Sequence, residues 1–254
     1  MDITVAIVRI PGRSVINGLT EAGLGKPDYE KLLQQHQEYC KTLESCGIHL
    51  IRLPPLDEFP DSCFVEDSAV VNKELAVITR SGAFSRRGES EHIAPIINEY
   101  FKVVKKIISP GTLDGGDILQ IGKKYFVGLS KRTNIEGATQ FQKFQEEVGF
   151  TVSLITMRDV LHLKTGINAL DNNVVLTAGE FINSMSFTEF DKIIIPPSES
   201  YAANCLNING TTIVPAGFPQ SLQKIRDLGY ITKEVEMSEF QKLDGGLSCL
   251  SIRF

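Results

Sequence analysis

The sequence of 254 residues predicts an α/β protein in which five similar units surround a central channel, as in a five-bladed α/β propeller. Two observations predict this fold. A pattern of helix, strand, loop and β-hairpin recurs five times, at spacings of roughly 35–50 residues, which is typical of radial repeats. The fifth unit ends in a single strand, 248–254, and the N-terminal strand, 3–10, can pair with it and close the ring.

The hairpins are the clearest elements of this repeat. Each one consists of two apolar strands joined by a short polar turn, and the Asn-Gly pair at 209–210 is the strongest turn signal. We predict the hairpins at 68–79, 117–129, 167–178 and 204–214.

An apolar strand precedes each hairpin, and a helix precedes most of these strands. Pro27 can open the first helix, while Gly149 and Gly229 can end two others. An α/β sheet with irregular hairpins is the alternative, and no linker divides the chain, so 1–254 is predicted to be one domain. The strands are predicted at 48–53, 103–108, 151–156, 191–196 and 231–237, and the helices at 28–46, 89–101, 134–148, 220–228 and, weakly, 183–190.

Composition narrows the function classes. The net charge of −5 gives no basic field for nucleic acid or an anionic membrane, and it suits a cationic small substrate. No apolar run approaches the roughly 18 residues of a membrane span, and the first residues do not match a secretory signal. Five cysteines without metal-ligand spacing indicate reduced thiols, a cytoplasmic protein and no metal site.

The loops between the first strands and the hairpins differ from unit to unit. In a ring, equivalent loops face the same channel, so their polar side chains are expected to lie together. The frame repeats while the chemistry varies, which favours one site assembled at the axis of the ring. In chain order the loops contain Asp61, Glu66 and Asp67; Asp114 and Asp117; His162; Asn204; and Asp244 and Cys249.

A cysteine near a histidine suggests nucleophilic catalysis. Carboxylates around them favour a planar guanidinium, which they bind through paired, charge-assisted hydrogen bonds. Together these residues point to an amidine or guanidine carbon as electrophile. The alternatives are a buried thiol for Cys249, a core histidine for His162, and, for the LDGG strings at 113–116 and 243–246, turns with glycines at positive φ.

Seven strings carry a resemblance to a known family. FPDSCFVED, SRRGE, LDGGD, RTN, LHLKTG, YAANC and DGGLSC occur in this order over essentially the whole chain. As a set they resemble the dimethylarginine dimethylaminohydrolases of the guanidino-modifying (pentein) superfamily. The resemblance implies the five-bladed propeller, one catalytic domain and no cofactor. It also implies hydrolysis of Nω-methylated arginines to citrulline and dimethylamine or methylamine.

The resemblance also implies a role for each site residue. Cys249 would attack the guanidinium carbon and form a thiouronium-type intermediate, with His162 as general acid and base. Asp114 would orient His162 or hold the guanidinium side; family members have Glu or Asp at this position, and Asp is the shorter form. The implied substrate-binding residues are Glu66 and Asp67 for the guanidinium, Asp61 for the α-ammonium, Arg86 and Arg132 for the α-carboxylate, and Leu19, Phe64 and Leu243 around the aliphatic part.

Two alternatives stay open. Arginine deiminases resemble this pattern, but they are longer and their histidine motif continues His-Leu-Asp, whereas this chain has Lys164 at the third position. A non-catalytic binding protein of the pentein fold would have no reason to keep Cys249 and His162 with the arginines. The expected partner is a small-molecule substrate, with a homodimer as one open state of assembly, and neither nucleic acid nor membrane is expected.

Overall fold

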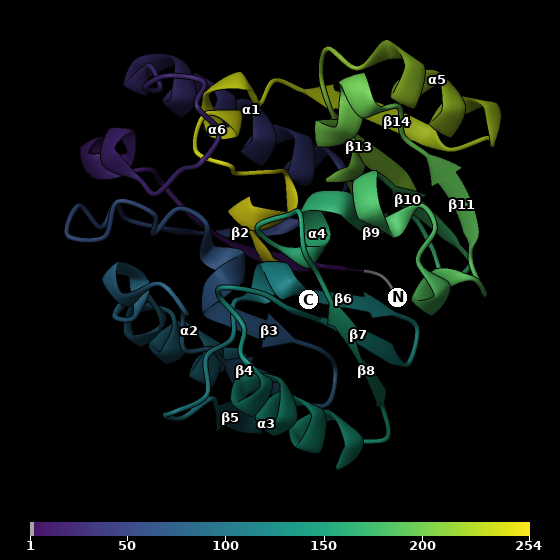
Figure 1. Cartoon of the computed structure of the whole chain (residues 1–254). Coiled ribbons are helices and arrows are strands. Elements are labelled where there is room, and N and C mark those ends of the chain that lie inside the picture. The colour runs from purple at the N-terminus through teal and green to yellow at the C-terminus, as the bar shows by residue number, and fades with distance from the viewer. Residues whose placement is uncertain (1–2) are drawn as a thin grey trace.

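The computed structural model describes residues 3–254, and the strands of this part form five three-stranded sheets. Figure 1 shows the sheets around the middle of the picture, with helices α1, α2, α3 and α5 on the outside. From the inner to the outer strand the sheets are β15 (Ile252–Arg253), β1 (Val5–Arg9) and β2 (His49–Leu53); β3 (Ala69–Val71), β4 (Ala76–Ile78) and β5 (Val104–Lys106); β6 (Ile118–Ile121), β7 (Lys124–Leu129) and β8 (Thr151–Thr156); β9 (Ile167–Ala169), β10 (Val174–Thr177) and β11 (Asp191–Ile194); and β12 (Leu206–Ile208), β13 (Thr211–Pro215) and β14 (Ile231–Val235).

The chain ends close the ring as predicted. Strand β1 pairs antiparallel with β15, with Ala6 opposite Arg253 and Ile7 opposite Ile252. The inner strands are neighbours around the axis, β15 beside β3, β6 beside β9 and β9 beside β12. The predicted five-bladed α/β propeller is therefore confirmed.

The unit recognised in the sequence spans two blades. Each strand that precedes a hairpin pairs in parallel with the second strand of the previous hairpin, as β5 does with β4 and β8 with β7. Parallel pairing needs a long crossover, and the intervening helix supplies it. The loop after each such strand consequently runs from one blade to the next, which brings the five loops to the axis.

The helices predicted at 28–46, 134–148 and 220–228 agree with the structure within two residues, whereas the one predicted at 89–101 is α-helical only over Ala94–Tyr100 and begins as a 3₁₀ turn at Glu89–His92. Helix α1 (Tyr29–Ser45) is capped by Asp28, whose side chain accepts a hydrogen bond from the N–H of Lys31. Pro27 therefore precedes the N-cap and does not open the helix. The weak fourth helix is only a 3₁₀ turn, Met185–Phe187. Within residues 3–254, no helix is both long and apolar enough to cross a membrane. The other helices are α2 (Ala94–Tyr100), α3 (Ile135–Glu146), α4 (Leu163–Gly166), α5 (Pro219–Asp227) and α6 (Ser238–Gln241).

Apolar packing holds neighbouring blades together. Successive side chains of a strand face opposite sides of its sheet, so a middle strand contacts both neighbouring blades. In β4, Ala76 and Ile78 pack with Ile7 of the blade before, whereas Val77 packs with Val127 of the blade after. Burial on both faces explains why the middle strands are continuous apolar runs in the sequence.

Candidate active site

Most of the predicted site residues surround one small cavity at the axis, with a volume of about 30 Å³. They come from loops that are far apart in the chain, which is what the ring geometry predicts. Asp114 and Glu66 do not line this cavity. The predicted residues that do line it are Leu19, Asp61, Phe64, Asp67, Arg86, Arg132, His162, Leu243 and Cys249.

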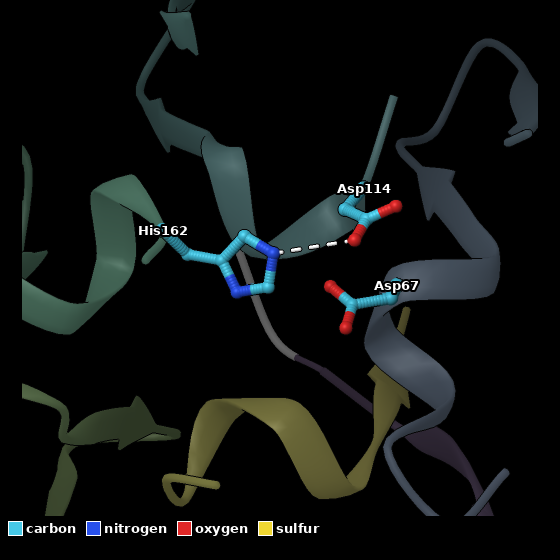
Figure 2. A group of neighbouring side chains, drawn as sticks. All are labelled: Asp67, Asp114 and His162. Atoms are coloured by element: carbon cyan, nitrogen blue, oxygen red, sulfur yellow. Dashed lines mark hydrogen bonds and ion pairs between the residues drawn. The ribbon is translucent and has the colours of Figure 1, made fainter. Parts of the chain in front are cut away.

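His162 stands directly before α4, and its ring faces Asp114 (Figure 2). Its Nε2 lies 3.3 Å from Oδ2 of Asp114, so the shorter aspartate does reach the histidine. His162 is 8 % exposed. Burial lowers its pKa, but Asp67, Asp117 and Asp114 together outweigh burial and raise the pKa to about 9. His162 is therefore an imidazolium at neutral pH.

Asp114 is fully buried, and its surroundings favour the carboxylate form. Burial raises its pKa, but the hydrogen bond and the positive charge of His162, with Arg86 nearby, bring the pKa below the usual value. The N–H of Gly82 donates to Oδ1 at 3.2 Å, and Nη1 of Arg132 lies 3.8 Å from Oδ2. Asp114 is thus a buried anion fixed beside the histidine.

Cys249 lies in a 3₁₀ turn, Ser248–Leu250, at the end of the loop between β14 and β15. Its Sγ accepts a hydrogen bond from the N–H of Gly246 at 3.4 Å. Burial, Glu66 and Asp67 raise the pKa of the thiol to about 12. The resting pair is therefore a neutral thiol and a protonated histidine.

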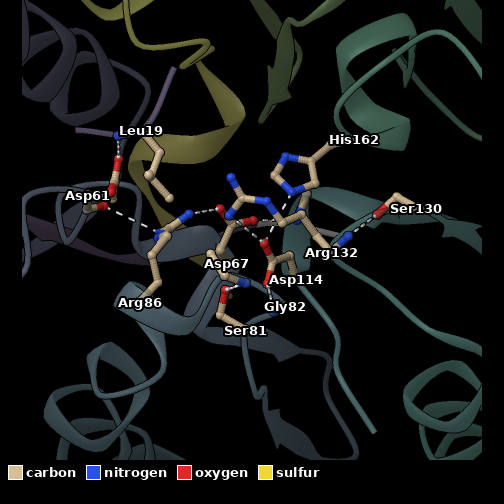
Figure 3. A network of polar contacts seen from close by, with 12 residues as sticks. Leu19, Asp61, Asp67, Ser81, Gly82, Arg86, Asp114, Ser130, Arg132 and His162 are labelled. Atoms are coloured by element: carbon tan, nitrogen blue, oxygen red, sulfur yellow. Dashed lines mark hydrogen bonds and ion pairs between the residues drawn. The ribbon is translucent and has the colours of Figure 1, made fainter. Parts of the chain in front are cut away.

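Asp67 and Arg86 form a buried ion pair in the cavity wall (Figure 3). Nη1 of Arg86 donates to Oδ2 of Asp67 at 2.6 Å, and the N–H of Gly116 donates to Oδ1 at 2.8 Å. Arg86 also makes three hydrogen bonds to Glu89, at 3.0, 3.2 and 2.8 Å. Both oxygens of Asp67 are consequently occupied, and most donors of Arg86 are engaged.

The second predicted arginine is less engaged. Nη1 of Arg132 is buried and has no hydrogen-bond partner among residues 3–254. Its 3.8 Å contact with Asp114 is an ion pair without hydrogen-bond geometry. Because a buried N–H without a partner is costly, this donor is suited to an anionic group entering the cavity.

Asp61 and Leu19 lie on the side of Arg86 that faces away from Asp67 (Figure 3). The N–H of Leu19 donates to Oδ1 of Asp61 at 2.9 Å, and the Leu19 side chain is 41 % exposed. Burial raises the pKa of Asp61, although Arg86 opposes it. A cationic group near Asp61 would further favour its ionised form.

Asp244 holds the segment that follows Leu19. Its Oδ2 accepts hydrogen bonds from the hydroxyl of Thr20 at 3.0 Å and from the N–H of Glu21 at 2.6 Å. The Thr20 hydroxyl also lies 2.8 Å from the carbonyl oxygen of Lys242. Leu19 and Leu243, expected around the aliphatic part of the substrate, are joined through these contacts.

Glu66 points away from its neighbour Asp67. It accepts hydrogen bonds from Ser248 and Arg253, each at 2.8 Å, and Nζ of Lys164 lies 2.6 Å away. This cluster borders a separate cavity of about 260 Å³ inside the ring. The expected pairing of Glu66 and Asp67 on one guanidinium is therefore not what the folded chain presents, because the two carboxylates face different cavities.

A larger cavity of about 590 Å³ adjoins the small one. His162 and Cys249 line both cavities, so they stand where the two meet. The wall of the larger cavity contains four carboxylates, which outnumber the cationic Lys164 and His162; they are Glu21, Asp159, Glu180 and Asp244. It is therefore a negatively charged space next to the reactive groups.

Asp67, Asp114 and His162 are the residues in 3–254 that could share a metal ion. Their ligand atoms lie within 4.8 Å of one another (Figure 2). However, Asp67 is paired with Arg86, and Asp114 with His162. A metal cation would have to displace Arg86 and the proton of His162.

Sequence reasoning missed the role of Glu89 and left Asp117 without one. Glu89 holds Arg86, and their spacing of three residues is the signal that could have shown it. Asp117 is buried, and its Oδ1 accepts a hydrogen bond from the N–H of Leu163 at 3.0 Å. Asp117 thus fixes the backbone next to His162.

Comparisons with known proteins agree with this site. A sequence model of the family described as arginine deiminase matches residues 54–200. The N(G),N(G)-dimethylarginine dimethylaminohydrolase of Pseudomonas aeruginosa is 47 % identical over 249 residues, which are 98 % of each chain.

Solved structures are similar over almost the whole length. A C249S mutant of the P. aeruginosa enzyme, complexed with citrulline, has a TM-score of 0.99 and 45 % identity over 100 % of both chains. An H162G dimethylarginine dimethylaminohydrolase adduct with S-methyl-L-thiocitrulline has a TM-score of 0.98 and 45 % identity, over 99 % of this chain and 100 % of the other. This chain therefore belongs to the dimethylarginine dimethylaminohydrolase family.

Proposed function

We propose that the protein hydrolyses Nω-methylated arginines to citrulline and dimethylamine or methylamine. One observation carries the proposal: Cys249 and His162 line one cavity whose charges complement an amino acid with a guanidinium group. Asp61 suits the α-ammonium, Arg132 the α-carboxylate, and Asp67 the guanidinium. The citrulline complex of the similar P. aeruginosa enzyme supports citrulline as the product.

Substrate binding would separate the Asp67–Arg86 ion pair, and each of the two residues would bind an oppositely charged group of the substrate instead. The incoming α-carboxylate would draw Arg86 and Arg132, and the guanidinium would take the carboxylate of Asp67. The ion pair thus holds both subsites ready while the cavity is empty. Leu19, Phe64 and Leu243 would enclose the aliphatic part of the substrate.

The methylated end of the substrate would face the larger cavity. With the amino-acid end near Asp61, the guanidinium carbon reaches the boundary of the two cavities, at Cys249 and His162. The amine released there is a cation at neutral pH, and the acidic wall of the larger cavity favours it.

The chemistry would proceed in two steps through Cys249. The guanidinium lowers the pKa of the nearby thiol, whose proton passes to solvent because His162 is already protonated, and the thiolate attacks the guanidinium carbon. His162 then donates its proton to the amine as the C–N bond breaks, and a covalent thiouronium-type intermediate remains. The neutral His162 next takes a proton from water, whose oxygen attacks the same carbon. The C–S bond then breaks as the hydroxyl proton of the intermediate passes to the sulfur, which gives citrulline and restores the thiol. Asp114 stabilises the protonated form of His162 in the first step.

Formation of a ureido product from dimethylarginine, monomethylarginine, arginine and agmatine tests this proposal; the product is citrulline for the three arginines and the corresponding carbamoyl amine for agmatine. We expect turnover of the methylated arginines and none by Cys249→Ser, whereas the matched control Cys46→Ser, at a half-buried free cysteine, should stay active. Preference for arginine would instead indicate an arginine deiminase-like hydrolase. Absence of product from every substrate would indicate a binding protein of the pentein fold.

The setting of the enzyme is also part of the proposal. Five free cysteines fit a reducing compartment such as the cytoplasm. The chain 1–254 would act as one catalytic domain, alone or as a homodimer, and size-exclusion chromatography with light scattering distinguishes these two states.

A further inference from the structure

A closed circle of side-chain hydrogen bonds joins the five loops at the axis. We call it the axial hydrogen-bond ring. Every joint links one loop to the next, and the last returns to the first. The donors and acceptors are Gly116 N to Asp67 Oδ1, 2.8 Å; Leu163 N to Asp117 Oδ1, 3.0 Å; Asn204 Nδ2 to Lys164 O, 3.0 Å; Ser248 N to Asn204 Oδ1, 2.9 Å; and Ser248 Oγ to Glu66 Oε2, 2.8 Å.

Asn204 hydrogen-bonds to both the loop that contains His162 and the loop that contains Cys249. Its amide donates to the carbonyl oxygen of Lys164, two residues after His162, and to Oγ of Ser248 at 3.0 Å. Its carbonyl accepts from the N–H of Ser248, directly before Cys249. A single buried side chain therefore connects both loops within two residues of each reactive group.

Gly246 shows how closely Asn204 is packed against the cysteine loop. A Cβ at Gly246 would lie 2.4 Å from Cγ of Asn204, well inside van der Waals contact. The same Gly246 supplies the N–H that donates to Sγ of Cys249. The amide of Asn204 therefore contacts the cysteine loop at Gly246 as well as at Ser248.

We propose that Asn204 is a positioning residue that sets the placement of Cys249 relative to His162. The proposal rests on the proposed hydrolysis, in which one group attacks a carbon and the other protonates the amine leaving it. Both must be correctly placed in the same transition state, and a misplacement of about 1 Å can cost about 100-fold in rate. Asn204 also lines the larger cavity, and its hydrogen bonds to the two backbones are the contacts through which it would act.

Asn168 provides a matched control. It is also a buried asparagine, and its amide donates to the same carbonyl of Lys164 at 2.7 Å and to the carbonyl of Ala203 at 2.9 Å. It makes no hydrogen bond to the loop of Cys249 among the contacts of residues 3–254. Asn168→Ala should therefore disturb the fold about as much as Asn204→Ala, without releasing the cysteine loop.

The first measurement is citrulline formation together with thermal unfolding. For Asn204→Ala we expect kcat to fall about 100-fold with KM changed less than about threefold. For Asn168→Ala we expect a similar fall in melting temperature but a kcat within about threefold of the wild type. Equal losses of kcat in the two variants would overturn the proposal.

A double-mutant cycle covers the case in which Asn204→Ala folds poorly. Gly246→Ala should lower kcat in the wild type, because its methyl group displaces Asn204. In the Asn204→Ala background the same change should cost little, since the displaced group is absent. The same cost in both backgrounds would count against the proposal.

Alkylation of Cys249 by iodoacetamide gives a readout that does not depend on turnover. We expect about tenfold faster labelling in Asn204→Ala, because its loop is released, and no change in Asn168→Ala. Identical labelling rates in the two variants would overturn the positioning role. A wild type that makes no citrulline but shows this labelling difference would refute the proposed function and leave the positioning role standing.

Discussion

The two LDGG strings, at 113–116 and 243–246, have the same residues but different conformations and contacts. Asp114 of the first copy has an extended backbone, with φ −106°, and is fully buried beside His162. Asp244 of the second copy is in the left-handed region, with φ 56°, and holds Thr20 and Glu21. Asp114 contacts His162, whereas Asp244, which lines both cavities, holds the segment that follows Leu19. The repeat thus supplies the frame, while the neighbouring loops decide what each acid does.

The glycines serve the two copies in the same way. None of the four has a positive φ, so the alternative in which they are left-handed turn residues is excluded. They permit close approach instead. A Cβ at Gly116 would lie 2.8 Å from the ring of His162, and one at Gly246 would lie 2.4 Å from Asn204. In both copies a neighbouring loop occupies the space that a side chain would need.

The largest effect is expected for the rate at which Cys249, which follows the second LDGG string, is alkylated. With a pKa of about 12, Cys249 is almost wholly protonated at pH 7. Its alkylation by iodoacetamide should speed up about tenfold per pH unit between pH 7 and 10, about 1000-fold in all. Mass spectrometry of the labelled peptide measures this rate. Rapid labelling at pH 6 would show that the resting thiol is already ionised.

Asp114→Asn tests the first copy. We expect kcat to fall about 100-fold, because the imidazolium loses its buried counterion. The pKa of His162, about 9 in the wild type, should fall as well, and NMR of the imidazole C–H signals measures it. Asp114→Glu serves as the control that restores the charge. An unchanged pKa in Asp114→Asn would contradict the role of this carboxylate.

Asp244→Asn tests the second copy and should have a smaller, different effect. It weakens the hydrogen bonds to Thr20 and Glu21, which are worth about 1.5 kcal/mol together, so KM should rise about tenfold. We expect kcat to stay near the wild-type value. Steady-state kinetics separates the two constants, and a large loss of kcat would place Asp244 in the chemistry after all.

The smallest effect on catalysis is expected at a second buried histidine, remote from both copies. Burial, with Arg52 nearby, lowers the pKa of His36 to about 4. The carboxylates near His162, in contrast, raise the pKa of His162. Because unfolded His36 binds its proton near pH 6.5, this group costs stability as the pH falls from 6.5 to 4, by about 3 kcal/mol.

Urea denaturation at pH 7 and pH 4 measures this cost. His36→Gln should lose less stability than the wild type over that range and should keep its activity at pH 7. An equal loss in both proteins would show that His36 does not titrate abnormally. Both histidines are buried, but only His162 has carboxylates beside it, whereas His36 has Arg52 nearby, so their pKa values shift in opposite directions.

The sequence by itself determined the five-fold repeat of strands and hairpins and the reactive residues that its loops carry. The hairpins, the preceding strands and the ring closure of β1 with β15 are visible because apolar periodicity and turn residues are local features. The placement of Cys249 and His162 at equivalent loops of one repeat follows from that frame. Both residues line the same cavity.

Only the tertiary structure decided how individual charged groups point and pair. Glu66 and Asp67 are adjacent in sequence but face different cavities, and Arg86 is held by Asp67 and Glu89 rather than left free. Blade boundaries were likewise offset from the sequence unit, because each outer strand pairs with an earlier hairpin. Such choices depend on which distant groups can neutralise a buried charge or complete a strand, and a local pattern does not contain that information.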